Sequence, residues 1–314
     1  MVAGPPPGNA APVKTEREIV RGRQRVRLTR LDQRWWPDVG LTKRDAVAYY
    51  EAAAPVLLPH LRDRPFTMKR HYNGPRSPYE WVKDAPEEMP DWIPVSPQPA
   101  RSRGGELVRY PLVQDELALL WMLELGCVDL HVWTARADRP DRPDFVLFDL
   151  DPAGVAFADV VQVALLLRAA LDALGLASLV NTTGGEGLHV RVPVARRQTY
   201  AEVRGFADIV TAALRRSSGG LVTTERLLER RRGVFVDTKM NGHGQQIAAP
   251  YSLRPLPGAP VATPLRWEEV GSALDPLAFT PRVVLKRVAR DGDLFEPLLH
   301  GRQRLGPALA RVAA

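Results

Sequence analysis

Cysteine and lysine are scarce in this 314-residue chain, and their scarcity excludes several classes of protein. Because Cys127 is its one cysteine, the chain has neither an internal disulfide framework nor a zinc site built from several cysteines, which fits a reducing compartment. No window approaches the roughly 18 apolar residues that a membrane span needs, and the N-terminus lacks an apolar signal segment. We therefore expect a cytoplasmic protein without membrane contact.

Lysine supplies only six of the 43 basic residues, which outnumber 36 acidic ones and give a net charge of +7 and a pI of about 9.8. A basic surface raises the local concentration of polyanions, so nucleic acid is the leading candidate partner, although solubility alone could also explain the charge. Lys43, Lys69 and Lys83 lie in one N-terminal stretch. Because an ammonium differs from a guanidinium in geometry and hydration, these three lysines are candidate phosphate contacts.

Several well-known catalytic motifs are also absent. The chain contains no Walker A, G-x-S-x-G, H-E-x-x-H, K-x-D-G or Rossmann G-x-G-x-x-G motif. Its chemistry must therefore be sought in other patterns of acids, glycines and bases.

Helix and strand patterns alternate irregularly along the chain. Residues 1–20, rich in Pro, Gly and Ala, predict a flexible arm, and residues 77–105 predict a long surface loop with a short hairpin. Helices are predicted from Thr42 onward, over 114–126, after Pro152, over 199–217 and over 266–273, with strands between them, including 234–237 and 245–251. This mixture favours an α+β or mixed-sheet α/β fold.

Two acids stand at the end of an apolar strand in the segment PDFVLFDLDPAG (143–154). Because side chains two apart share a face of a strand, Asp149 and Asp151 point to one side, while Phe148 and Leu150 point into the opposite layer. Two carboxylates held together repel each other, so one must take up a proton or a cation must neutralise them. Hard oxygen ligands suit Mg²⁺ or Mn²⁺, and the pattern therefore predicts a metal-binding pair.

Two other interpretations of these acids stay open. Asp151 can cap a helix that begins at Pro152, with Asp149 merely solvated. Phosphatases of the haloacid-dehalogenase type also end an apolar strand in D-x-D, and the first acid, here Asp149, is then the nucleophile. That family places its motif near the start of the chain, whereas about half of this chain precedes it.

A glycine-rich turn and a third acid follow. In TTGGEGLHV (182–190), three glycines let backbone N–H groups approach an anion and Thr183 adds a hydroxyl, which predicts a phosphate cradle. A plain hairpin turn, with His189 as a core histidine, is the simpler interpretation. Farther on, the strand VFVD (234–237) ends in Asp237 between arginine-containing segments. A third carboxylate completes the usual requirement of a two-metal site for phosphoryl displacement.

The order of these motifs carries a family resemblance. FDLDP (148–152), TTGGEGLHV, VFVD and AAPYSLRPLPGAP (248–260) together resemble the polymerase domain of bacterial ligase D and its stand-alone relatives in the archaeo-eukaryotic primase superfamily. The resemblance runs from about Arg21 to about Thr280. It implies a mixed α/β (α+β) fold with a primase-like catalytic core, in which two sheets meet at an acidic cleft flanked by helices.

The resemblance also implies a division of the chain. Its parts are an arm (1–20), a primase-polymerase domain (21–300) and a C-terminal tail (301–314). The domain comprises a part that binds DNA ends and template (21–140), a catalytic core (141–280) and an extension (281–300).

Roles for individual residues follow from the same resemblance. Asp149, Asp151 and Asp237 match the acids that bind two Mn²⁺ or Mg²⁺ ions. Residues expected to contact the incoming nucleotide are Lys69, Arg70, His131, Thr183, Gly184, His189, Arg232 and Arg254. Residues expected to contact DNA are Arg30, Lys43, Trp81 and Lys83; a Trp in a basic loop, however, is also commonly a packing anchor.

The chain departs from the family pattern at several positions. Glu186 stands where the family has Lys in its Ser-Gly-Gly-Lys-Gly turn, which should weaken triphosphate binding unless the side chain turns to solvent or pairs with an Arg. Arg30 and Gln33 replace the usual Asn and Lys of a 5′-phosphate pocket, and Met240 replaces a common Gln. These departures keep open a catalytically weak scaffold that grips broken DNA ends.

The main function implied is template-directed nucleotidyl transfer. Members of the family add nucleotides, ribonucleotides by preference, to primer ends at short gaps or double-strand breaks. The expected partners are gapped or broken DNA, NTPs or dNTPs, a separate ATP-dependent DNA ligase and a Ku-type end-binding protein. We expect a monomer in the cytoplasm, associated with the nucleoid.

Overall fold

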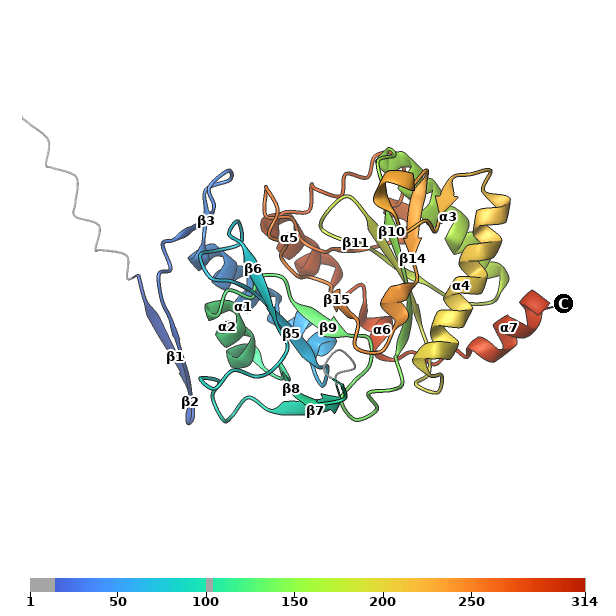
Figure 1. Cartoon of the computed structure of the whole chain (residues 1–314). Coiled ribbons are helices and arrows are strands. Elements are labelled where there is room, and N and C mark those ends of the chain that lie inside the picture. Colours follow the sequence, from blue (N-terminus) through green and yellow to red (C-terminus); the bar gives the residue numbers. More distant parts are fainter. Residues whose placement is uncertain (1–14, 100–103, 314) are drawn as a thin grey trace, which may run out of the picture.

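Two lobes, each built on its own sheet, make up the part of the chain that this computed structural model describes, residues 15–99 and 104–313 (Figure 1). The N-terminal lobe comprises residues 15–135 and one later strand, and the C-terminal lobe comprises the remainder. Most of the predicted arm, residues 1–14, lies outside the described residues. The prediction of a flexible arm is wrong for its end, because β1 (Arg17–Arg21) pairs with β2 (Gln24–Leu28) in a hairpin.

A four-stranded sheet and two helices form the N-terminal lobe. The sheet has the order β15-β9-β5-β6, from strands Gln246–Ala248, His131–Trp133, Phe66–His71 and Tyr79–Val82. Helix α1 (Lys43–Leu61) begins where predicted, since Thr42 and Asp45 form a capping box. Helix α2 (Glu116–Glu124) is capped by Asp115. Both helices therefore start at residues whose side chains satisfy free backbone N–H groups.

Short hairpins border this lobe. β3 (Arg34–Trp36) pairs with β4 (Leu41–Thr42), and β7 (Val95–Pro99) pairs with β8 (Leu107–Pro111). The loop predicted over 77–105 contains the β7 arm of this hairpin and also β6, so it is more ordered than its irregular sequence indicates.

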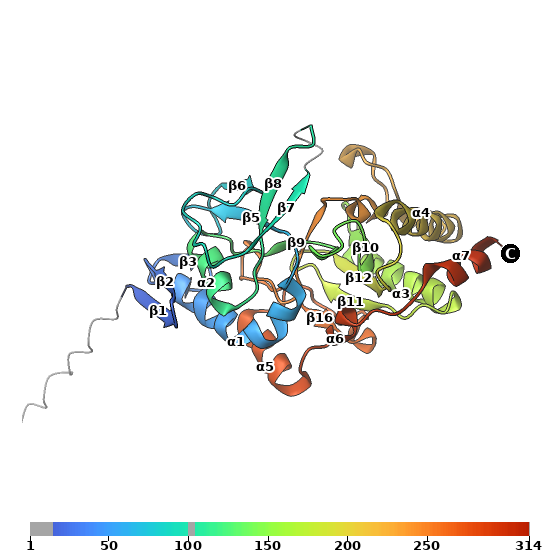
Figure 2. The same ribbon diagram turned by 90° about the horizontal axis from the view of Figure 1, so that it is seen from below.

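The C-terminal lobe is a six-stranded sheet covered on one face by two helices (Figures 1 and 2). Its order is β13-β14-β10-β12-β11-β16, from strands Val222–Thr223, Val234–Asp237, Phe145–Asp151, Leu188–Pro193, Leu179–Thr182 and Pro264–Leu265. All neighbours are antiparallel except β13 and β14. Helices α3 (Phe157–Ala173) and α4 (Tyr200–Ser217) bury their apolar residues against it. The mixed α/β fold class predicted from the sequence is confirmed.

Strand β10 separates two apolar layers as its alternation predicts. Phe148 and Leu150 join the main core with α3 and α4, whereas Leu147 joins a second cluster that includes Ile247 of β15. The face that carries Asp149 is therefore the one turned toward the sheet of the N-terminal lobe.

The C-terminal segments pack against both lobes. Helix α5 (Pro281–Asp291) contacts α1, α6 (Glu296–Leu299) contacts β12, and α7 (Leu305–Ala313) contacts α4. The expected tail is thus largely helical. Single 3₁₀ turns complete the described chain at Leu228–Arg230 (η2), Lys239–Asn241 (η3) and Trp267–Glu269 (η4), the last within the helix predicted over 266–273. Among residues 15–99 and 104–313, no helix has both the length and the apolar character required to cross a membrane.

Candidate active site

The three predicted acids lie at the ends of two neighbouring inner strands of the C-terminal sheet. Asp149 and Asp151 end β10, and Asp237 ends its antiparallel neighbour β14. The register places Asp149 directly opposite Asp237, although 88 residues of chain separate them by number. Because directly opposed residues of an antiparallel pair point to the same face, the two carboxylates lie side by side.

Burial and mutual repulsion shape the charge of this group. Burial, followed by the negative charge of Asp149, raises the pKa of Asp151 to about 7; Asp237 adds to the rise and Arg231 opposes it. Asp151 is thus partly protonated near neutral pH. A divalent cation bound among the three acids would remove the repulsion, and all three side chains offer the hard oxygen ligands that Mg²⁺ and Mn²⁺ prefer.

Two of the acids are held by contacts that engage one oxygen each. Asp149 Oδ1 lies 3.3 Å from His189 Nε2, and Asp237 Oδ1 accepts a 2.8 Å hydrogen bond from the backbone N–H of Lys239. In the described part of the chain, no three His, Cys, Asp or Glu side chains are drawn together tightly enough to form a finished metal site. The acids thus offer the ligand chemistry and the charge that suit divalent cations, but they do not form a preassembled metal site in this structure.

The helix-cap interpretation of Asp151 is wrong. Helix α3 begins at Phe157, with Ala156 at the capping position, because Ala153 and Gly154 adopt positive φ angles of 44° and 86° and turn the chain first. The carboxylate of Asp151 therefore caps no helix and stays available beside the other two acids.

The glycine turn connects β11 to β12. It packs so closely against Leu150 and Arg254 that two of its glycine positions have no space for a side chain. A Cβ on Gly187 would lie 2.5 Å from the carbonyl oxygen of Leu150, and a Cβ on Gly184 would lie 2.4 Å from Cγ of Arg254. Thr183 Oγ1 accepts hydrogen bonds from the N–H groups of Gly185 and Gly187 at 3.2 and 3.3 Å. The turn is therefore both a hairpin and a tightly folded loop beside the acids, and the Thr183 hydroxyl hydrogen is left for another acceptor.

His189 lies beside Asp149, directly opposite it on β12. Its side chain is 3% exposed, and burial lowers its pKa although Asp149 opposes the change. It is thus a buried histidine that contacts Asp149, a position suited to orienting the carboxylate.

A second charged centre, which sequence analysis missed, surrounds Asp129 in the N-terminal lobe. Lys69 Nζ lies 2.9 Å and His131 Nε2 lies 3.0 Å from its Oδ2, and His71 Nε2 lies 3.8 Å from its Oδ1. Burial alone would raise the pKa of Asp129, but the two histidines outweigh it and hold the pKa well below its usual range. Asp129 thus fixes Lys69 and His131, two residues predicted to contact the nucleotide.

Arg254 joins this centre to the glycine turn. Its Nη1 donates a 3.0 Å hydrogen bond to the carbonyl of Thr183, and its charge affects the pKa values of both Asp129 and His189. The structure therefore gathers Arg254, the turn, the acids and the Asp129 centre around one place between the sheets.

In the segment before β14, the arginine whose charge reaches the acids is not Arg232, the one that the sequence analysis selected. Arg231 stacks on Phe235, 3.7 Å from the ring centre, and its charge reaches Asp151. Arg232 is exposed and donates to the backbone carbonyls of Glu229 and Arg231. Arg231 is therefore the arginine of this segment whose charge reaches the acids in this structure.

Arg70 lies beside Tyr72, 5.0 Å from the ring centre, and 3.6 Å from Glu88. It comes from the same strand as Lys69 but engages different partners.

The proposed 5′-phosphate residue Lys43 is buried. Its Nζ lies 2.6 Å from Glu124 Oε2, and Glu124 also accepts two hydrogen bonds from Thr29. Burial lowers the pKa of Lys43, which Glu124 partly offsets. The charge of Lys43 is therefore already compensated. Arg30, in a left-handed conformation with φ of 49°, is exposed beside it.

Trp81 lies over the Asp129 centre. It is 44% exposed, and its ring lies 4.9 Å from that of His131 and 5.7 Å from Lys69 Nζ. Lys83, two residues after Trp81, lines a cavity between the lobes. The lysine beside the Trp81 ring is therefore Lys69, and the role of Trp81 and Lys83 as a stacking unit for DNA stays a prediction.

A family model described as the LigD primase-polymerase domain matches residues 42–295. The chain belongs to this family. The resemblance inferred from the sequence motifs is thereby confirmed, and it favours the polymerase interpretation of the D-x-D strand over the phosphatase one.

Curated relatives in the LigD family are longer than this chain. The chain is 34% identical over 286 residues to the multifunctional non-homologous end joining DNA repair protein LigD of Mycobacterium tuberculosis, and 30% identical over 274 residues to the bifunctional LigD of Bacillus subtilis. These alignments cover 88% and 86% of this chain but only 37% and 44% of the relatives. The chain thus spans less than half the length of the curated relatives it matches.

A solved structure supports the same assignment. The polymerase domain of Mycobacterium tuberculosis ligase D, determined in complex with DNA, aligns with a TM-score of 0.82 and 32% identity, covering 90% of this chain and all of that one. The LigD polymerase fold therefore extends over nearly the whole chain.

Proposed function

We propose that the chain is a template-directed nucleotidyltransferase that adds nucleotides to primer ends at short gaps or double-strand breaks in DNA. The observation that carries the proposal is the register of β10 and β14, which brings Asp149 and Asp151 together with Asp237 beside the glycine turn. Family membership and the DNA-bound ligase D polymerase domain support it.

The residues divide the work of a phosphoryl transfer. Asp149, Asp151 and Asp237 would hold two Mn²⁺ or Mg²⁺ ions, which when bound lower the pKa of a primer hydroxyl and neutralise a triphosphate. Arg254 and the Thr183 hydroxyl lie where a triphosphate would need donors. His189 contacts Asp149 from the neighbouring strand and would orient its carboxylate.

The Asp129 centre and Trp81 suit the parts of the substrate away from the triphosphate, either the base of the nucleotide or the template strand. Lys69, held by Asp129, is a fixed cation beside the aromatic faces of Tyr79 and Trp81. Such a pairing fits the base and backbone of a nucleotide or of a template strand. We further propose a preference for ribonucleotides, sealing by a separate ATP-dependent ligase with a Ku-type partner, and action as a monomer at the nucleoid in the cytoplasm.

Extension of a labelled primer on gapped DNA tests the proposal. The Asp149→Asn variant should lose extension in both Mg²⁺ and Mn²⁺ while unfolding at the same urea concentration as the wild type. Comparison of rNTPs with dNTPs in the same assay measures the sugar preference. Undiminished extension by Asp149→Asn would remove the proposed active site.

Glu186 favours a second candidate, a scaffold that binds broken ends without efficient synthesis. Its side chain is exposed and has no ion pair among the described residues, so it places a negative charge at the rim of the turn. DNA binding without detectable incorporation at saturating Mn²⁺ would support the scaffold, whereas robust incorporation would eliminate it.

A further inference from the structure

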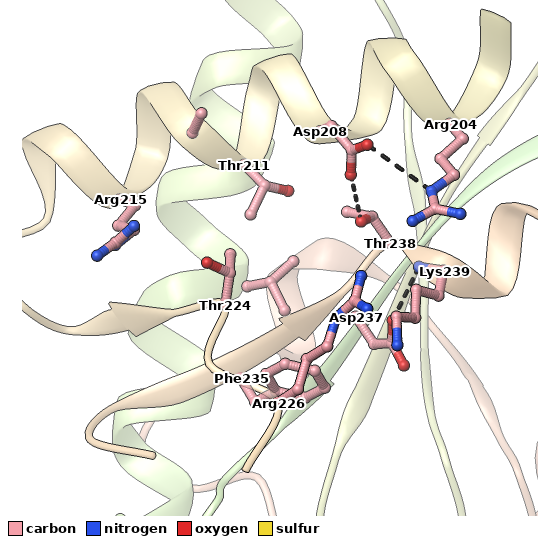
Figure 3. Close-up of a pocket in the computed structure, with 12 residues that line it drawn as sticks. Arg204, Asp208, Thr211, Arg215, Thr224, Arg226, Phe235, Asp237, Thr238 and Lys239 are labelled. Carbon is pink, nitrogen blue, oxygen red and sulfur yellow. Dashed lines mark hydrogen bonds and ion pairs between the residues drawn. The ribbon is translucent and has the colours of Figure 1, made fainter. Parts of the chain in front are cut away.

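A basic groove runs along β14 on the side away from the glycine turn. One cavity of about 300 Å³ lies between α4 and β14 and has Asp237 on its wall (Figure 3). A second, of about 380 Å³, lies between the lobes and is lined by Lys83 and Trp133. Arg204 and Lys239 line both cavities, so the two adjoin; we call them together the α4 groove.

Positive charge in the α4 groove is largely uncompensated. Lys83, Arg215, Arg226 and Lys239 line it, and none of them has a carboxylate within 4.0 Å in the described part of the chain. The acid Asp208 is already engaged by Arg204 and by the Thr238 hydroxyl (Figure 3). Four cations without acidic partners along these walls attract a polyanion.

Two buried polar groups on the groove wall also lack partners. Thr211 is 2% exposed, and its Oγ1 makes no hydrogen bond within the described residues; the same is true of Nε1 of Trp133, which is 1% exposed. Such groups are costly to bury unsatisfied, so their presence on the wall points to a ligand that supplies the missing bonds. A hydroxyl beside arginines suits a phosphate, and an indole and a tyrosine in the second cavity suit a base or sugar.

The order of the strands indicates which ligand the α4 groove binds. In the sequence β14-β10-β12, the acids are central, the glycine turn and Arg254 lie on the β12 side, and the α4 groove lies on the β14 side. The attacking and leaving oxygens of a phosphoryl transfer stand roughly in line, on opposite sides of the phosphorus. With the triphosphate on the β12 side, the attacking hydroxyl must come from the β14 side.

We propose that the α4 groove binds the primer strand, holding the phosphates next to its 3′ end on Arg215 and Arg226 so that the terminal hydroxyl reaches the acids. This inference rests on the proposed function, since it assumes a primer. It identifies residues of α4 and of the segment before β14 as the part of the protein that selects a strand with a free 3′ end.

The test is a charge-matched pair of double variants in the full chain. R215Q/R226Q removes two cations from the groove, and R216Q/R230Q removes two exposed cations from the same segments that do not line it. Binding to a labelled primer-template is measured by fluorescence anisotropy, without metal or nucleotide, over a range of salt. We expect R215Q/R226Q to bind about tenfold more weakly, with the slope of log K against log salt reduced by about 1.8, and R216Q/R230Q to bind nearly as the wild type does. Equal losses in the two variants would overturn the proposal.

Neutral methylphosphonates in the DNA identify the strand. Replacing the two primer phosphates nearest the 3′ end should weaken binding to the wild type but add nothing to R215Q/R226Q, because the interaction is already lost. If template phosphates show this non-additivity instead, the groove binds template and the proposal is wrong. Because binding is measured without catalysis, a wild type that binds in this way but extends no primer would contradict the proposed function and still support the groove.

Discussion

Replacing Gly184 with alanine tests how closely Arg254 is packed on the glycine turn. Gly184 has a φ of 71°, in the left-handed region. A Cβ added there would lie 2.4 Å from Cγ of Arg254 and 2.9 Å from the backbone nitrogen of Ala262. Both distances are shorter than any Cβ contact tolerates, so either the turn or its neighbours must move.

The cost can be worked from these two observations. The left-handed conformation costs alanine about 1 to 2 kcal/mol. Arg254 can yield because its side chain is flexible, but the backbone at Ala262 cannot do so cheaply, and overpacking of this kind costs about 1 to 3 kcal/mol. We therefore expect Gly184→Ala to lower the free energy of unfolding by about 2 to 5 kcal/mol. Displacing Arg254 also breaks its bond to Thr183, so the KM for nucleotide should rise.

Gly185→Ala is the matched control. A Cβ there would meet only Thr183 Oγ1 at 3.5 Å and a Leu256 methyl at 3.6 Å, which are ordinary contacts, and its φ lies outside the left-handed region. Urea unfolding followed by circular dichroism compares the two variants with the wild type. If Gly184→Ala unfolds within about 0.5 kcal/mol of Gly185→Ala, the packing argument is refuted.

Three further changes test other parts of the site. Glu186→Lys should lower the KM for nucleotide relative to Glu186→Gln, because it brings a cation to the rim of the triphosphate turn; equal KM values would show that the side chain does not reach the ligand. Lys43→Met should destabilise the fold by about 3 kcal/mol in urea unfolding, since it leaves the Glu124 carboxylate without its cation, and Lys43→Met with Glu124→Gln should recover part of the loss, because the neutral amide oxygen still accepts from Thr29. Trp81→Ala should weaken template binding in anisotropy assays by about 1 to 3 kcal/mol for a stacked base, with an unfolding midpoint near that of the wild type.

The sequence predicts the elements whose signals are local. The capping box of Thr42 marks the start of α1, and the period of two in β10 separates Asp149 and Asp151 from the buried layer. The start of α3 is misplaced because the favourable Pro152 is followed by two residues with positive φ angles, which the helix pattern does not reveal.

Contacts between distant segments are beyond such signals. Asp129 is one acid in the short segment CVDLHVW, with no period or spacing to mark it, and it becomes central only because β5 and β9 pair. In the same way, Lys43 resembles a phosphate contact in sequence, whereas Glu124 meets it across 81 residues of chain. Charge compensation of this kind depends on the tertiary fold alone.

β15 crosses from the C-terminal lobe to the sheet of the N-terminal lobe, which explains how the Asp129 centre and the three acids come together. Residues 246–248 leave the C-terminal sheet and pair with β9, whose first residue is His131 of the Asp129 centre. Six residues after β15 ends, Arg254 is back at the glycine turn. One short segment therefore ties both halves of the site, and any change that loosens β15 should separate the Asp129 centre from the acids before it unfolds either sheet.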